Sequence, residues 1–256
     1  MPIPGAAGIL YPAADMRYIS TRGRAAPRDF EGVLLAGLAE DGGLFLPEAW
    51  PALSTAEWRA LRGLPYAELS ARLIHPFCGD ALPFEALRAM TGAAYARFGH
   101  PAVAPLVQLD HRTFALELFH GPTLAFKDLA MQLLGRLFDH ALARRGERVT
   151  IVGATSGDTG SAAIEACRDR DALDVVILHP LGRTSEVQRR QMTTVLSPNI
   201  RNFAVEGDFD TCQDLVKGMF NDAPFRTEQR LAAVNSINWA RIAAQIPYYA
   251  YAALAL

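Results

Sequence analysis

Apolar residues change their spacing about 100 residues into the chain, and this change predicts two regions of different architecture. In the first region they recur every three or four residues, as on one face of a helix. The predicted helices cover 29–38, 54–62, 66–74 and 84–97, and the segment 43–47 has the pattern of a strand. We therefore expect a mostly helical N-terminal domain at 16–97 and a second domain at 98–256.

In the second region, short apolar strands alternate with amphipathic helices. The predicted strands are 114–118, 149–153, 174–178, 203–205 and 232–234. The predicted helices are 128–145, 161–168, 185–195, 209–220 and 238–256, the last with a kink at Pro247. This alternation favours an α/β fold in which a largely parallel sheet is flanked by helices.

The two ends of the chain have distinct patterns. The first 15 residues hold three prolines and two glycines, which predicts a disordered extension. They place no basic residue before an apolar stretch, so we do not expect a secretory signal. The last predicted helix ends without a C-terminal cap, and Ile246, Tyr249 and Leu254 belong to an apolar face without a predicted partner. We therefore expect a fragment whose C-terminal part is missing.

The charge balance and the cysteines exclude several classes of protein. Lys plus Arg number 25 and Asp plus Glu 27, so the net charge is -2 and nucleic acid is not an expected partner. No apolar run is long enough to cross a membrane as a helix, so membrane contact is not expected either. Cys78, Cys167 and Cys212 have no metal-ligand spacing, which indicates no metal site and a reducing compartment such as the cytoplasm.

Lysine is rare in this chain. Of 25 basic residues 23 are Arg, and the two lysines are Lys127 and Lys217. Arg supplies a permanent charge, whereas Lys can lose its proton and form a Schiff base. Lys127 follows Phe126 between a predicted strand and a helix. It is a candidate for a Schiff base, and the alternative is that it is only a solvated charge on the surface. Lys217 lies three residues after Asp214 in a predicted helix, so an exposed ion pair explains it.

A glycine- and hydroxyl-rich segment, Gly153–Ser161, joins another predicted strand to a helix. Three glycines and four hydroxyl groups at a helix N-terminus predict an anion site, while the alternative is an ordinary capping turn. The segment lacks the Gly-Lys-Ser/Thr of a nucleoside triphosphate loop and the spacing of a dinucleotide-binding loop. Its candidate ligand residues are Thr155, Ser156, Gly157, Asp158 and Thr159.

A third polar segment precedes the last predicted helix. Its candidate ligand residues are Asn235, Ser236, Asn238 and Arg241, the last with a planar fork suited to phosphate. The alternative is an Asn cap followed by a surface Arg. All three segments follow predicted strands, and open parallel sheets bind ligands at the carboxyl ends of their strands. Together they predict a substrate with a carboxylate and a phosphate, processed through an imine.

With these three segments in this order, the sequence resembles the threonine synthases of the longer bacterial and fungal branch, among the fold-type-II pyridoxal-phosphate enzymes. The resemblance runs from residue 18 to the end of the chain, and Tyr18–Gly23 and Gly37–Leu44 are similar to that branch's N-terminal domain. It implies that Lys127 holds pyridoxal 5'-phosphate as an internal aldimine. Further cofactor contacts are implied at Phe126, Asp158 and Thr159.

The resemblance also implies the substrate contacts. Thr155, Ser156, Gly157 and Thr159 would meet the substrate carboxylate. Asn235, Ser236, Asn238 and Arg241 would meet the substrate phosphate. Asp158 would lie along the cofactor ring, at a position where related enzymes of the wider fold often have Asn.

The implied reaction converts O-phosphohomoserine and water to threonine and phosphate. The nearest alternative is a threonine or serine dehydratase-like lyase, whose substrate carries no phosphate. A second alternative is a truncated, inactive homologue. The family places its cradle for the cofactor phosphate later in the chain, so we expect residues 1–256 alone to bind the cofactor weakly and to lack activity. Regulation and oligomeric state are not predicted.

Overall fold

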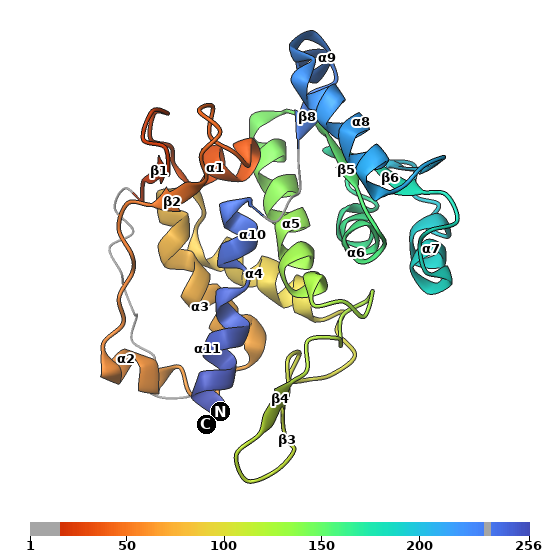
Figure 1. Ribbon diagram of the computed structural model, residues 1–256. Helices are drawn as coiled ribbons and strands as arrows, with labels where there is room; N and C mark the ends of the chain where they lie inside the picture. The colour runs from red at the N-terminus through yellow and green to blue at the C-terminus, as the bar shows by residue number, and fades with distance from the viewer. Residues whose placement is uncertain (1–15, 233–236) are drawn as a thin grey trace.

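A parallel sheet forms the centre of the second region in the computed structural model, which describes residues 16–232 and 237–256 (Figure 1). Its strands lie in the order β7-β6-β5-β8, and each neighbouring pair is parallel. They are β5 (Val149–Ala154), β6 (Leu173–Pro180), β7 (Ile200–Val205) and β8 (Leu231–Ala232). The predicted α/β fold is thus confirmed, while part of the predicted strand 232–234 lies outside the described residues.

Helices bury both faces of this sheet. Side chains of β6 alternate between the faces, because successive residues of a strand point to opposite sides. Val175 and Ile177 join the main core, which also contains the buried face of α6 (Asp158–Cys167). Leu178 packs on the other face against Cys212 of α8 (Phe209–Asn221). Burial on both faces explains why the strands are near-continuous apolar runs.

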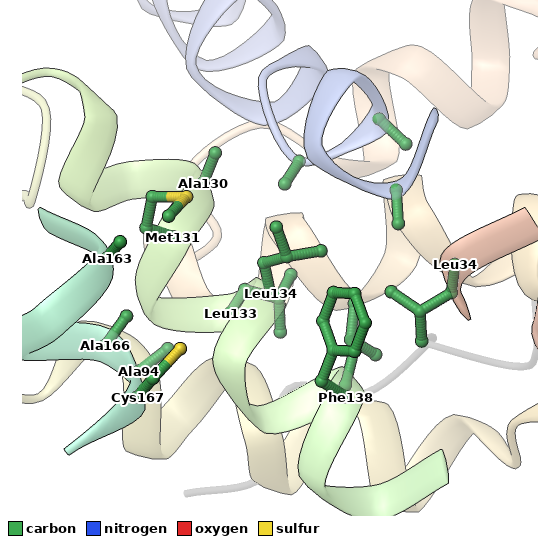
Figure 2. Packing of buried hydrophobic residues seen from close by; sticks show 14 of the residues in the cluster. Leu34, Ala94, Ala130, Met131, Leu133, Leu134, Phe138, Ala163, Ala166 and Cys167 are labelled. Atoms are coloured by element: carbon green, nitrogen blue, oxygen red, sulfur yellow. The ribbon is translucent and has the colours of Figure 1, made fainter. Parts of the chain in front are cut away.

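Helix α5 (Lys127–Arg145) lies at the centre of the main core. Figure 2 shows Leu133, Leu134 and Phe138 of α5 among side chains from α1 (Phe30–Ala36), α4 (Phe84–Tyr95) and α6. The helix is therefore buried nearly all round, which requires apolar residues on more than one face. In the described part of the chain, no helix is long and apolar enough to span a membrane.

The N-terminal region combines helices with a small antiparallel sheet. Its strands β1 (Tyr18–Ser20) and β2 (Phe45–Pro47) pair with each other. Its remaining elements are α2 (Thr55–Ala60), α3 (Tyr66–Cys78) and a 3₁₀ turn (Gly79–Ala81). The predicted helices of this region are all present, and α3 extends past its predicted end. One cluster of buried residues runs from Tyr18 to Tyr248, so the two regions share a core.

The end of the chain differs from the prediction of one kinked helix. Two helices are present, α10 (Trp239–Ala243) and α11 (Ile246–Ala255). Pro247 lies in the first turn of α11, where its missing N–H costs no helical bond, so it starts a helix. The apolar face of α11 has a partner, because Leu254 packs beside Leu69 of α3, whereas Tyr249 is exposed.

The strand predicted at 114–118 is present only at β4 (Phe114–Leu116), and it does not belong to the parallel sheet. It pairs antiparallel with β3 (Leu106–Gln108), which the pattern did not predict. Asp110 closes this hairpin by accepting bonds from the N–H groups of Arg112 and Thr113. We predicted that all three polar segments follow strands of the parallel sheet. This prediction is wrong for the segment that contains Lys127, because β4 belongs to a separate hairpin.

Two further helices complete the second region. The helix predicted at 185–195 is α7 (Glu186–Thr193), which begins after the capping residue Ser185. A short helix, α9 (Ala223–Glu228), follows α8 and was not predicted. Helix α9 has Pro224 in its first turn and Asp222 as its cap, a combination that favours a helix start.

Candidate active site

Lys127 is the first residue of α5, and its side chain is only 16% exposed. Its Nζ atom lies 4.5 Å from the centre of the Phe126 ring, a cation–π contact. Phe126 occupies the N-cap position without capping the helix and is itself 45% exposed. The start of α5 thus places an amine at the edge of the core, where solutes can reach it.

The loop before Lys127 is held by the residue after it. Asp128 is fully buried and accepts bonds from the N–H and the hydroxyl of Thr123, each 2.7 Å long. Burial raises the pKa of Asp128, and the bonds from Thr123 partly oppose this. A Cβ on Gly121 would lie 2.8 Å from Cγ of Asp128, so the loop passes too close for any other residue. The sequence pattern did not predict the anchoring role of Asp128, although an acid in the first turn of a helix is a signal for such an anchor.

The second loop lies between β5 and α6 and is folded around Thr155. This residue is buried, and its Oγ1 accepts bonds from the N–H groups of Gly157, at 3.0 Å, and Gly160, at 2.8 Å. Gly157 has a φ of +148°, which only glycine adopts readily. Ser156 is exposed at the tip of the loop. The N–H of Gly157, one of the candidate ligand residues, is therefore bonded to Thr155 within the loop.

The two loops meet at an ion pair between Lys127 and Asp158. Asp158 is the first residue of α6, and it also accepts a 2.8 Å bond from the N–H of Thr159. Burial raises the pKa of Asp158, but the hydrogen bond and the charge of Lys127 outweigh burial and bring it below its ordinary value. The structure thus brings together two segments that the sequence analysis identified separately.

The third polar segment is described from residue 237 onward. Asn235 and Ser236 lie outside the described residues. Asn238 is fully buried and caps α10, with its Oδ1 accepting a bond from the N–H of Ala240 at 3.0 Å. Its Nδ2 donates to the carbonyl of Leu34 in α1 at 2.8 Å. Both polar groups of Asn238 are therefore used in fixing α10 to the N-terminal region.

Arg241 lies in α10 and is 6% exposed. Burial lowers the pKa of its guanidinium, and the negative charge of Asp158 opposes this, so the two groups share one environment. Within residues 16–232 and 237–256, no acceptor is bonded to its guanidinium. A buried guanidinium with free donors is suited to binding a carboxylate or a phosphate.

The chemistry of these side chains fits pyridoxal phosphate. The aldehyde of this cofactor needs a primary amine, and Lys127 offers one in a sheltered position. A carboxylate and a buried guanidinium lie in the same environment, at Asp158 and Arg241. In the described part of the chain, no group of His, Cys, Asp or Glu side chains could hold a metal ion.

Comparisons with known proteins agree with this chemistry. The family model "Threonine synthase N terminus" matches residues 17–95, and the model "Pyridoxal-phosphate dependent enzyme" matches residues 100–254. A threonine synthase from Pseudomonas aeruginosa is 59% identical over 241 residues, which are 94% of this chain and 51% of the relative. The chain thus spans about half the length of the curated relatives it matches.

Solved structures give the same result. The chain is similar to the pyridoxal-phosphate-bound threonine synthase from Brucella melitensis, with a TM-score of 0.92 and 56% identity over 94% of this chain and 52% of that one. It is also similar to the threonine synthase from Escherichia coli, with a TM-score of 0.81 and 36% identity over 94% of this chain and 54% of that one. The chain therefore belongs to the family of pyridoxal-phosphate-dependent enzymes, and its N-terminal region is of the threonine synthase type.

Proposed function

We propose that Lys127 holds pyridoxal phosphate and that the full-length protein is a threonine synthase, which converts O-phosphohomoserine and water to threonine and phosphate. The observation that carries this proposal is the ion pair between the Lys127 amine and the Asp158 carboxylate, whose charge also acts on the buried Arg241 guanidinium. The relatives named above support it, because they are threonine synthases by name and match most of this chain.

Lys127 has two roles in this proposal. Its amine attaches the cofactor, and once released by the substrate it moves protons at the substrate carbons. When bound, pyridoxal phosphate supplies an electron sink for negative charge at those carbons. Asp158 keeps the amine oriented toward the site, and Phe126 limits its movement on one side. We place Asp158 and Thr159 beside the cofactor ring.

The loop after β5 would bind the substrate carboxylate. Ser156 is exposed at its tip, and Thr159 is partly exposed at the start of α6, so both hydroxyl groups can donate to an anion. Thr155 would shape this loop, because its oxygen already accepts two amide bonds. Gly157 permits the backbone turn between Ser156 and Asp158.

The segment before α10 would bind the substrate phosphate. Arg241 is buried and its guanidinium has no acceptor among the residues that the structure describes, and a charge-assisted pair with phosphate would offset the cost of its burial. Asn238 would act on this contact by fixing the start of α10. Asn235 and Ser236 are further candidates for the phosphate.

Purified full-length protein, loaded with pyridoxal phosphate and given O-phosphohomoserine, tests the proposal. We expect release of phosphate together with formation of threonine. Formation of 2-oxobutanoate from threonine, or of pyruvate from serine, without phosphate release, would instead indicate a dehydratase. Absence of any product from a protein that binds the cofactor would contradict the proposed reaction.

We also propose the cytoplasm as the location of the protein, since all three cysteines are free and buried, as in reducing compartments.

A further inference from the structure

Helix α7 presents one face to both loops of the site. The inward positions are Gln188, Gln191 and Met192, which are spaced three and four residues apart and so share a face. The outward residues Glu186 and Arg190 pair with each other in solvent. No sequence motif marked this helix, because its polar residues have the pattern of a surface segment.

Gln191 connects α7 to the loop before Lys127, residues 121–126, which we call the lysine loop. Its Nε2 donates to the carbonyl of Thr123 at 3.0 Å, across 68 residues of sequence. The N–H and the hydroxyl of the same Thr123 bind Asp128, the residue next to Lys127. Gln191 therefore completes the set of bonds that fixes the backbone just before the amine.

Gln188 and Met192 connect α7 to the second loop. The carbonyl of Gln188 accepts a 3.4 Å bond from the hydroxyl of Ser161, and the Gln188 side chain fills the space beside Gly157. The fully buried Met192 lies so close to Gly160 that a Cβ there would come within 2.9 Å of its sulfur. The loop that carries Asp158 is thus packed tightly against the same helix.

We infer that α7 sets the position of Lys127 relative to Asp158, and that Gln191 is the positioning residue of this arrangement. The two loops belong to different helices, and a shared third element keeps their relative position constant as the site binds its ligands. Close packing makes such an element rigid, because side chains in a packed interior have little room to shift. The inference rests on the proposed function only in that Lys127 carries the cofactor.

The substitution Gln191→Glu tests this inference with almost no change of shape. The introduced carboxylate cannot donate to the carbonyl of Thr123, so the bond is lost. We expect the backbone amides of 121–126 to exchange hydrogen about fivefold faster in the cofactor-free chain, since one hydrogen bond is worth about 1 kcal/mol. The control Arg190→Ala alters the outward face of α7 and should leave this exchange unchanged.

Two further readings separate positioning from general destabilisation. Amides of α8, which packs on the opposite face of the sheet from α6, should keep their exchange rates in Gln191→Glu. The difference in the exchange rates of amides 121–126 between variant and parent should also shrink as the pH falls through the pKa of the introduced carboxyl. The protonated carboxyl group can donate a hydrogen bond to Thr123 again. Equal acceleration in α8, or a difference that does not respond to pH, would overturn the inference.

Cofactor binding gives an independent result. Titration with pyridoxal phosphate, followed by visible absorbance, should show about fivefold weaker binding to Gln191→Glu than to the parent and to Arg190→Ala. Equal affinity of all three would overturn the role of Gln191. This titration uses the full-length protein and its variants. If the full-length parent does not bind, the proposed function fails, and the exchange experiment still decides whether α7 holds the lysine loop.

Discussion

The two lysines occupy opposite environments. The Lys127 side chain is 16% exposed and pairs with Asp158, whereas that of Lys217 is 65% exposed and pairs with Asp214 at 2.9 Å. The exposed ion pair predicted for Lys217 is confirmed. Exposed pairs of this kind contribute little to stability, so an Arg would serve there equally well. A sheltered amine is the property that distinguishes Lys127 from the 23 arginines.

Arg241 offers a prediction about substrate recognition. Replacing it by Ala in the full-length protein should weaken use of O-phosphohomoserine by about 2–4 kcal/mol in kcat/KM terms, because a charge-assisted pair is lost. Attachment of the cofactor to Lys127 should persist, and its absorbance provides the internal control. An unchanged kcat/KM would show that Arg241 does not bind the phosphate.

Asp158 offers a prediction about pH. Its pKa is below the ordinary 3.8 in the folded chain, because the effect of Lys127 exceeds that of burial. The stabilisation by this pair is therefore complete above about pH 4 and is lost as the pH falls through the lowered pKa. We expect Asp158→Asn to lower the free energy of unfolding at pH 7 and to approach the parent at acid pH, below the lowered pKa of Asp158, as measured by urea unfolding. The matched variant Asp214→Asn should have little effect at either pH, and a difference for Asp158→Asn that is constant with pH would contradict this account.

The candidate site was predictable where its residues form local motifs. Lys127 stood out by its rarity, and Asp158 by its place in a loop rich in glycine and hydroxyl groups. Asp128 and Gln191 were not predicted, because their bonds depend on how the chain folds back. Gln191 is 68 residues from its acceptor, and a polar residue in a helix is most often exposed. The roles assigned to the individual site residues stay predictions.

Contact between α5 and α6 depends on one glycine. A Cβ on Gly135 of α5 would lie 2.5 Å from the carbonyl oxygen of Ala166, which is rigid backbone of α6. Glycine therefore permits these helices to approach, and their first residues are Lys127 and Asp158. The spacing of the two helices and the geometry of the site are thus linked through the same pair of elements.

We predict that Gly135→Ala destabilises the chain by about 1–3 kcal/mol, because the helices must separate. The matched control is Gly92→Ala in α4, where nothing lies within 4 Å of an added Cβ. That change should stabilise the chain by about 0.5–1 kcal/mol through helix propensity. Urea unfolding measures both, and equal effects of the two substitutions would contradict the close contact at Gly135.

Elements with a strong period were predicted correctly, and pairings between distant segments were not. The helices α5 to α8 and the strands β5, β6 and β7 follow directly from apolar spacing. The hairpin of β3 and β4 was missed, since whether a strand joins a neighbour or the main sheet is decided by tertiary contacts. The break between α10 and α11 was predicted as a kink, because Pro247 is compatible with either.

At the scale of the whole molecule, the two regions share one core. Trp239 of α10 packs against Tyr18, Trp50 and Phe77 of the N-terminal region, with ring centres 5.5 to 6.0 Å apart. The boundary between the two family models, at 95 and 100, therefore does not separate two cores. A division of the chain into domains at 97 and 98 stays a prediction.

We predict that the chain unfolds as one unit. The three tryptophans are Trp50, Trp58 and Trp239, so their fluorescence reports on the N-terminal region and its contact with α10. Far-ultraviolet circular dichroism reports on all helices. The two signals should change at the same urea concentration, as in a two-state transition. Separate midpoints would show that the regions fold independently.

A core substitution should move both signals together. Leu133 of α5 is fully buried at the centre of the shared cluster, so Leu133→Ala should cost about 2–5 kcal/mol. The expected result is an equal shift of both midpoints.

The most direct test of the account asks which residue carries the cofactor. The chain is incubated with pyridoxal phosphate, reduced with borohydride and digested, and the labelled peptide is identified by mass spectrometry. The two lysines make the result unambiguous, and Lys127→Arg keeps the charge but cannot react with the aldehyde. The account predicts a label on Lys127 that disappears in Lys127→Arg. A label on Lys217, or on neither lysine, would contradict it.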